Sequence, residues 1–165
     1  MRASPEIEIQ IRQAICQDAL ALAKVLYESF VEFEALYTRQ GFAATILNAE
    51  QILVRMREGP VWLACREDKV CGTVVAVLKG DALYMRGMAV LPCARGFGVG
   101  ARLLEQVEKW ASDQGCRRIF FSTTPFLTAA IQFYEKFGFR RTGEGPHDLF
   151  KTPLFTMEKN VPHKT

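Results

Sequence analysis

The sequence of 165 residues has little histidine and no closely paired cysteine. Its two histidines are His147 and His163, and its five cysteines, at positions 16, 65, 71, 93 and 116, form no Cys-x-x-Cys pair. An odd number of scattered cysteines suggests neither a disulfide framework nor a zinc ribbon, so we expect reduced thiols and no bound metal. Such cysteine usage is typical of a cytoplasmic protein, and we expect that location here.

The sequence also lacks a charge excess and a long apolar run. Its 21 basic and 18 acidic residues leave a net charge of +3, which is too small to indicate a nucleic-acid or membrane partner. No apolar run approaches the roughly 20 residues of a membrane helix, and residues 1–10 lack a signal-peptide core, so neither export nor a membrane span is expected. We expect one soluble domain over residues 1–165, with its core from about 7 to 159.

Hydrophobic periodicity predicts a mixed α/β fold with an antiparallel first half. Strands are expected at residues 7–12, 61–66, 70–79, 82–91, 118–123, 139–142 and 152–158. Helices are expected from residue 18 to about 30, from 41 toward 56, over 99–111 and over 126–137. The buried stripe of the first helix is expected at Leu20, Ala23, Leu26, Tyr27 and Phe30.

A glycine-rich loop lies between the predicted strand 82–91 and the helix that follows it. Its sequence at 95–100 is Arg-Gly-Phe-Gly-Val-Gly, and glycines at the start of a helix free backbone N–H groups to bind an anion. Residues 82–104 contain Arg86, Arg95 and Arg102 but no acidic residue, so this stretch is electropositive. The loop therefore predicts a phosphate site, although glycines here could also serve only to make a tight turn.

The same loop fits a second pattern, because Gly96, Gly98 and Ala101 match the Gly-x-Gly-x-x-Gly/Ala sequence of nicotinamide-binding folds. The next predicted strand, 118–123, carries no acidic residue to hold a ribose, and an antiparallel meander precedes the loop. No Gly-Lys-Ser/Thr follows, so a Walker A loop is absent. A nicotinamide-dependent oxidoreductase stays open as a less favoured alternative.

Three separated motifs together resemble the GCN5-related N-acetyltransferase (GNAT) family. They are the segment 88–92 (Met-Ala-Val-Leu-Pro), the loop residues Arg95, Gly98 and Gly100, and the late run Tyr134, Gly138 and Phe139. The resemblance extends from about residue 9 to 159. It implies a mostly antiparallel sheet of six to seven strands that is splayed at one parallel pair and flanked by about four helices.

The resemblance implies acetyl-CoA as the cosubstrate and a primary amine as the acceptor. The pantetheine would lie along Met88, Ala89 and Val90. The pyrophosphate would lie on the backbone of Arg95, Gly96, Phe97, Gly98, Val99, Gly100 and Ala101. Tyr134 would be the acid, since a phenol with a pKa of about 10 is protonated at neutral pH and can protonate a thiolate. Its other interpretation is a core aromatic among Phe126, Phe133 and Phe137.

The sequence departs from the family at two positions. Acetyltransferases of this family often carry an acidic residue ahead of the pantetheine segment, where residues 84–87 here are Tyr-Met-Arg-Gly, and an asparagine where Leu127 stands. A coenzyme A-binding module without turnover therefore remains an alternative. Cys93, just ahead of the loop, is expected to be a spectator because the family transfers acetyl directly.

Residues of the acceptor side are expected from the early helices, the strand before the loop and the segment 143–153. They are Glu28, Glu32, Tyr84, Arg86 and His147, and the glutamates could instead form a solvated helix face. The base could be water or one of Glu32, Glu34, His147 and Asp148. The acceptor is expected to be a small molecule or a peptide, no nucleic-acid partner is expected, and exposed edge strands leave a homodimer open.

Overall fold

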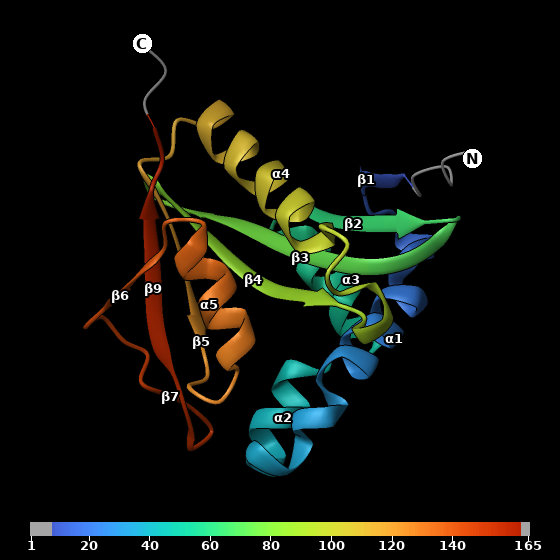
Figure 1. The fold of residues 1–165 in the computed structure, drawn as a ribbon, viewed down its shortest axis with the longest axis horizontal. Coiled ribbons are helices and arrows are strands. Elements are labelled where there is room, and N and C mark those ends of the chain that lie inside the picture. Colours follow the sequence, from blue (N-terminus) through green and yellow to red (C-terminus); the bar gives the residue numbers. More distant parts are fainter. Residues whose placement is uncertain (1–7, 163–165) are drawn as a thin grey trace, which may run out of the picture.

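The computed structural model describes residues 8–162 and places a seven-stranded sheet at the centre of the molecule (Figure 1). The strands lie in the order β1-β2-β3-β4-β5-β9-β6, and among these described strands only β4 and β5 pair in parallel. Their bounds are β1 Ile9–Gln13, β2 Val61–Arg66, β3 Lys69–Lys79, β4 Ala82–Val90, β5 Arg118–Thr123, β6 Arg140–Thr142 and β9 Phe155–Asn160. This arrangement confirms the expected fold class.

A short ribbon interrupts the chain between β6 and β9. It consists of β7 (Asp148–Leu149) and β8 (Thr152–Pro153), which pair antiparallel outside the main sheet. The expected single strand over 152–158 is therefore wrong. Pro153 has no N–H for a ladder, and the backbone N–H of Leu154 donates to the carbonyl of His147 at 2.9 Å, so the chain turns here before β9 begins.

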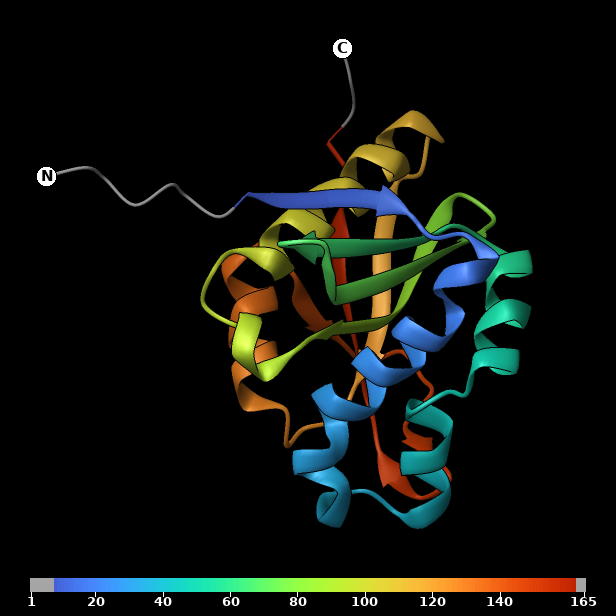
Figure 2. The same cartoon turned by 90° about the vertical axis from the view of Figure 1, so that its right-hand side faces the viewer.

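Helices cover both faces of the sheet. The α-helices are α1 Ala19–Phe30, α2 Arg39–Thr45, α3 Ala49–Glu58, α4 Val99–Asp113 and α5 Thr128–Lys136, and short 3₁₀ turns are η1 Cys16–Asp18, η2 Val31–Leu36 and η3 Pro92–Ala94. Helices α4 and α5 pack on one face, and α1 and α3 on the other (Figures 1 and 2). Within residues 8–162, no helix has the length and apolar character needed to cross a membrane.

The helical stretch expected from 41 toward 56 is two helices. Asn48 separates them, because its side chain accepts a hydrogen bond from the backbone N–H of Gln51 at 2.9 Å. The Gln51 side chain in turn accepts from the backbone N–H of Asn48 at 3.0 Å, which completes a capping box. This start signal fixes the position of α3, whose residue Arg55 becomes important below.

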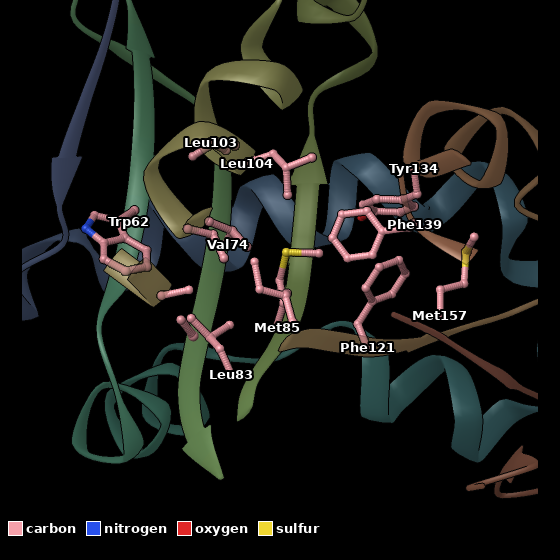
Figure 3. Close-up of a cluster of buried hydrophobic side chains, with 14 of the residues drawn as sticks. Trp62, Val74, Leu83, Met85, Leu103, Leu104, Phe121, Tyr134, Phe139 and Met157 are labelled. Atoms are coloured by element: carbon pink, nitrogen blue, oxygen red, sulfur yellow. The ribbon is translucent and has the colours of Figure 1, made fainter. Parts of the chain in front are cut away.

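Each face of the sheet has its own apolar core. The core under α4 and α5 includes Leu83, Met85, Leu104 and Phe121 (Figure 3), and the core under α1 and α3 is built on residues such as Leu63. The stripe expected for α1 is wrong in part, because Leu20 is 77% exposed and Tyr27 is also exposed. The buried residues of α1 are Ala19, Leu22, Val25, Leu26 and Ser29. The helix is apolar on most sides, so periodicity alone allows more than one buried face.

Candidate functional site

The sheet opens between β4 and β5. Three pairs join these strands, the last being Tyr84 with Phe120, and no pair within the described chain joins them further along. β5 continues beside β9, whereas β4 runs on beside β3 to Val90, so the two strands diverge (Figure 1). Along this stretch β4 turns an unpaired backbone edge toward the gap.

A β-bulge lies at the start of the open stretch. The β3–β4 register shifts where one residue of β3, Val74, stands opposite both Gly87 and Met88 of β4. Gly87 has a φ of +63°, a conformation that glycine adopts without steric cost. Bulges of this kind bend a strand and redirect its side chains, so the divergence of β4 has a local cause. The sequence-predicted residues Met88, Ala89 and Val90 follow directly after it.

The chain then forms the expected glycine loop at the N-terminus of α4. Gly96 and Gly98 have φ values of +84° and +86°, and a Cβ added at either would meet no atom within 4 Å. The first helical hydrogen bond is donated by Arg102 to the carbonyl of Gly98 at 3.1 Å, which leaves the amides of residues 99–101 without a helical acceptor. No acidic residue stands in the first turn of α4, so this open concavity fits a phosphate group.

Packing connects the loop to the gap. A Cβ added at Gly100 would lie 3.2 Å from Cζ of Phe133 and 3.7 Å from Cε of Met88, so the start of α4, the bulged strand and α5 meet here. Val99 is buried beneath the loop, and Ala101 is partly buried. Phe97 is exposed, and the guanidinium of Arg66 lies 4.1 Å from the centroid of its ring.

The arginines that made this stretch electropositive in sequence have acidic partners elsewhere. Arg95 donates to Glu32 at 2.6 Å and to the carbonyl of Ser29 at 3.0 Å, Arg86 pairs with Glu58, and Arg102 lies 4.0 Å from Glu105. A positive stretch inferred from residues 82–104 alone is therefore wrong. The attraction of the loop for an anion rests on its backbone amides and the helix dipole.

Tyr134 of α5 lies on the side of the sheet that carries α4. It is 7% exposed, and its ring lies 4.2 Å from that of Phe121, with Phe139 beside both (Figure 3). The ring of Phe133 is also in contact, at 5.3 Å. Burial raises the pKa of Tyr134 above its ordinary value, so the phenol stays protonated at neutral pH. Its expected neighbour Phe126 is not among these rings, because α5 begins at Thr128 and Phe126 packs on Tyr37 at 4.8 Å.

The residues expected on the acceptor side fall into separate groups. Tyr84 stacks on Phe120 at 5.3 Å and lies 5.8 Å from the guanidinium of Arg86, so these two residues of β4 lie together at the mouth of the gap. Glu28 is 3.8 Å from Lys24 on α1, and Glu32 is held by Arg95, so neither glutamate stands free. His147 is exposed in the turn before β7.

Other expectations concern single residues. Leu127 is the N-cap of α5, and its apolar side chain donates no hydrogen bond to a ligand. Cys93 is exposed in η3, and all five cysteines are free thiols. Within residues 8–162, no three His, Cys, Asp or Glu side chains gather in a group that could hold a metal ion.

Two polar groups near the site were not predicted from the sequence. Arg55 of α3 lies partly buried beside β4, and its signal was its spacing of three from the buried Ile52, which puts it on the inner face of the helix. Thr38 accepts from the amide of Gly41 at 3.0 Å and donates to the carbonyl of Phe150 at 2.7 Å, which joins α2 to the β7–β8 ribbon. No local pattern announces this second contact, because 112 residues separate its partners.

The sequence pattern of the Acetyltransferase (GNAT) family matches residues 21–139. The chain is also 30% identical over 135 residues to the Escherichia coli K12 protein named "Uncharacterized N-acetyltransferase YjgM", covering 78% of this chain and 80% of that one. The chain belongs to the GNAT acetyltransferase family. The resemblance drawn from the three motifs is thus confirmed.

Two further N-acetyltransferases are similar to the chain, one in fold and one in sequence. The PaiA N-acetyltransferase of Thermoplasma acidophilum, solved in complex with coenzyme A, superposes with a TM-score of 0.81 at 19% identity, over 93% of this chain and 99% of that one. An aminoglycoside N(6')-acetyltransferase type 1 of Salmonella typhimurium is 32% identical over 60 residues, which is 36% of this chain and 41% of that protein. Residues 8–162 contain one parallel strand pair, whereas nicotinamide-binding folds repeat parallel βαβ units.

Proposed function

We propose that this protein is an acetyl-CoA-dependent N-acetyltransferase that moves the acetyl group directly to a primary amine of a small molecule or peptide. The observation that carries the proposal is the opened β4–β5 pair beside the open amides at the start of α4. Phe133, which lies against Gly100 at the start of α4, also packs on Tyr134. An unpaired strand edge and an amide concavity in series suit a long ligand with an amide-bearing arm and a phosphate-bearing end.

We propose that the backbone of this chain binds most of the cosubstrate. The unpaired edge at Met88, Ala89 and Val90 would bind the pantetheine amides, and the amides of residues 95–101 would bind the pyrophosphate. The left-handed Gly96 and Gly98 support this assignment, because open space lies where their side chains would be. Acetyl-CoA supplies the activated thioester when it is bound.

The transfer requires a polarised carbonyl and a proton for the departing thiolate. We assign the first role to a backbone N–H near Met88, which would hold the carbonyl oxygen as an oxyanion hole does. We assign the second to the hydroxyl of Tyr134, which burial keeps protonated. The amine nitrogen bonds to the acetyl carbon as the carbon–sulfur bond breaks, and the proton lost by nitrogen balances the proton gained by sulfur.

The remaining role is that of the base that receives the proton of the amine. β4 presents no carboxylate at residues 84–87, and Glu32 is already held by Arg95. We therefore propose that water receives the proton and that the acceptor reacts as the neutral amine. This predicts a rate that rises with pH up to the pKa of the acceptor amine.

Ligand-dependent unfolding tests the binding half of the proposal. A ligand at 100 times its Kd adds about 2.7 kcal/mol to the unfolding free energy, which for a chain of this size raises Tm by about 5–11 °C. We expect this rise with acetyl-CoA and coenzyme A, and none with NADPH or ATP. A rise with NADPH alone would contradict the proposal.

Thiol release from acetyl-CoA with a panel of amines tests turnover. We expect release that depends on the amine, together with the N-acetylated product by mass spectrometry. The absence of a carboxylate from β4 and the presence of Leu127 favour one other candidate, a module that binds coenzyme A without turnover. That candidate predicts the rise in Tm but no product with any amine.

A further inference from the structure

One arginine beside β4 has no ion pair with any carboxylate in residues 8–162. Arg55 of α3 is partly buried, and its Nη1 atom is 3.1 Å from the position that a Cβ on Gly87 would occupy. The glycine at the bulge therefore leaves the space that the guanidinium fills. No carboxylate among the described residues lies within ion-pair distance of Arg55, although Glu58 is near enough to act on it electrostatically.

A second guanidinium lies beside the first. Arg86 of β4 pairs with Glu58 through Nη2, but its Nε atom is buried and has no hydrogen-bond partner in the described part of the chain. The guanidinium groups of Arg55 and Arg86 thus have one carboxylate near them, that of Glu58. Burial and, after it, the charge of Arg86 lower the pKa of Arg55 to about 10, so Arg55 remains charged at neutral pH and lies in the repulsive field of its neighbour.

The pair lies where an acceptor would approach. Arg86 is two residues beyond Tyr84, the last β4 residue paired to β5, and it lies on the face of the sheet that carries α1 and α3. Tyr134 is on the opposite face, with α4 and α5. A strand rises about 3.3 Å per residue, so Arg86 lies within about 7 Å of Met88 along β4. An anion held by Arg86 would therefore be close to the acetyl group.

The surroundings indicate what kind of anion fits. A small cavity beside Gly87 is lined by Arg55, Thr73 and apolar side chains from α1, α3 and the sheet. Burying a guanidinium without an anion is unfavourable, and a carboxylate matches its two parallel N–H donors.

We propose that the acceptor is an amino carboxylate whose carboxylate is bound by Arg55 and Arg86. This inference rests on the proposed function and narrows its substrate class. The carboxylate completes the ion pairs that Glu58 leaves unfilled and holds the amine of the same molecule at the opening between β4 and β5. The arginines are binding residues for the acceptor and take no part in the proton transfer.

The test compares acceptors that differ only in charge. The probes are the standard L-amino acids, their C-terminal amides and the corresponding amino alcohols, with kcat/KM expressed per neutral amine. We expect at least one amino acid to be acetylated about 10- to 100-fold more efficiently than its amide and its alcohol, the range for a lost charged hydrogen bond.

Three variants assign the preference to the site. Arg55→Met and Arg86→Met keep the volume of the side chain and should each reduce the preference for the carboxylate about tenfold or more, chiefly through KM, while the amide changes less than threefold. Arg57→Met is the matched control, because Arg57 is an exposed residue of the same helix. It should leave the preference unchanged.

Several outcomes would overturn the inference. Equal acetylation of acid and amide would do so, and so would a preference that survives both arginine variants. If no probe is acetylated, the rise in Tm that N-acetylated amino acids cause in the presence of coenzyme A replaces turnover, and no rise with any of them overturns the inference. A protein that fails to bind acetyl-CoA at all contradicts the proposed function itself, which separates the two failures.

Discussion

The two faces of β4 carry different kinds of chemistry. Toward α4 and α5 the strand meets methionine and aromatic side chains, with the buried Tyr134 as the polar group assigned to the reaction. Toward α1 and α3 it carries Tyr84 and Arg86, next to Arg55 and Glu58. The face toward α4 and α5, called the dry face below, is apolar and neutral. The face toward α1 and α3, called the charged face below, carries charged groups that are only partly paired within the chain.

This difference teaches how one strand can serve two substrates. The proposed cosubstrate site is made largely of backbone amides, glycine conformations and a helix terminus, which belong to the fold. The proposed acceptor site is made of side chains contributed by separate elements. Changing Arg55 or Arg86 would therefore alter which amine binds without altering how acetyl-CoA binds, and the predictions below test that separation.

The largest effect is expected on the dry face. Tyr134→Phe removes the only proton donor that we assign there, so kcat should fall about 10²- to 10³-fold while the Kd for coenzyme A changes less than threefold. Steady-state thiol release and calorimetric titration measure the two quantities. Tyr27→Phe, at an exposed position of α1, is the matched control. Full activity of Tyr134→Phe would return this tyrosine to a packing role.

A smaller effect is expected in the glycine loop. Gly98→Ala places a methyl group in the open space of a left-handed turn, so the Kd for coenzyme A should rise about 10- to 50-fold and the unfolding free energy should fall by about 1–2 kcal/mol. Gly80→Ala is a close control, because Gly80 also has a positive φ, of +61°, and open space around its Cβ position. It should show the same loss of stability with unchanged binding, and equal binding by both variants would place the phosphates elsewhere.

The smallest effect concerns stability at high pH. Because burial raises the pKa of Tyr134 above that of the unfolded chain, its contribution to the unfolding free energy is complete below about pH 10 and is lost as pH rises further. The wild-type protein should lose about 1.4 kcal/mol more per pH unit above that point than Tyr134→Phe, as measured by urea unfolding. Parallel curves for the two proteins would mean that the phenol is reached by water in the folded state.

The fold and the dry face were largely predictable from sequence. The strands from 61 to 90 are short apolar runs separated by polar turns, Gly115 follows the end of α4 with a φ of +72°, and the motif residues follow one another closely along the chain. Local patterns of this kind reflect backbone requirements, which short segments encode completely. The boundary at Asn48 was also encoded, as a capping box, but the helical periodicity on both sides obscured it.

The charged face could not be predicted in the same way. Arg95 and Glu32 are 63 residues apart, and Arg86 and Glu58 are 28 apart, so counting charges along residues 82–104 gave the wrong local balance. The buried face of α1 failed for a related reason, since most sides of that helix are apolar and only packing selects one. Contacts between distant segments decide such features, and one sequence does not reveal them.

The bulge at Gly87 also bears on the tendency of the protein to aggregate. By parting from β5, β4 creates a sheet edge in the middle of the molecule, and free edges are the usual templates on which other chains add strands. Here helices cover both faces of the sheet on which this edge lies. Because both faces are covered, we expect a neighbouring chain to add a strand here less readily than at an edge on the rim of a sheet.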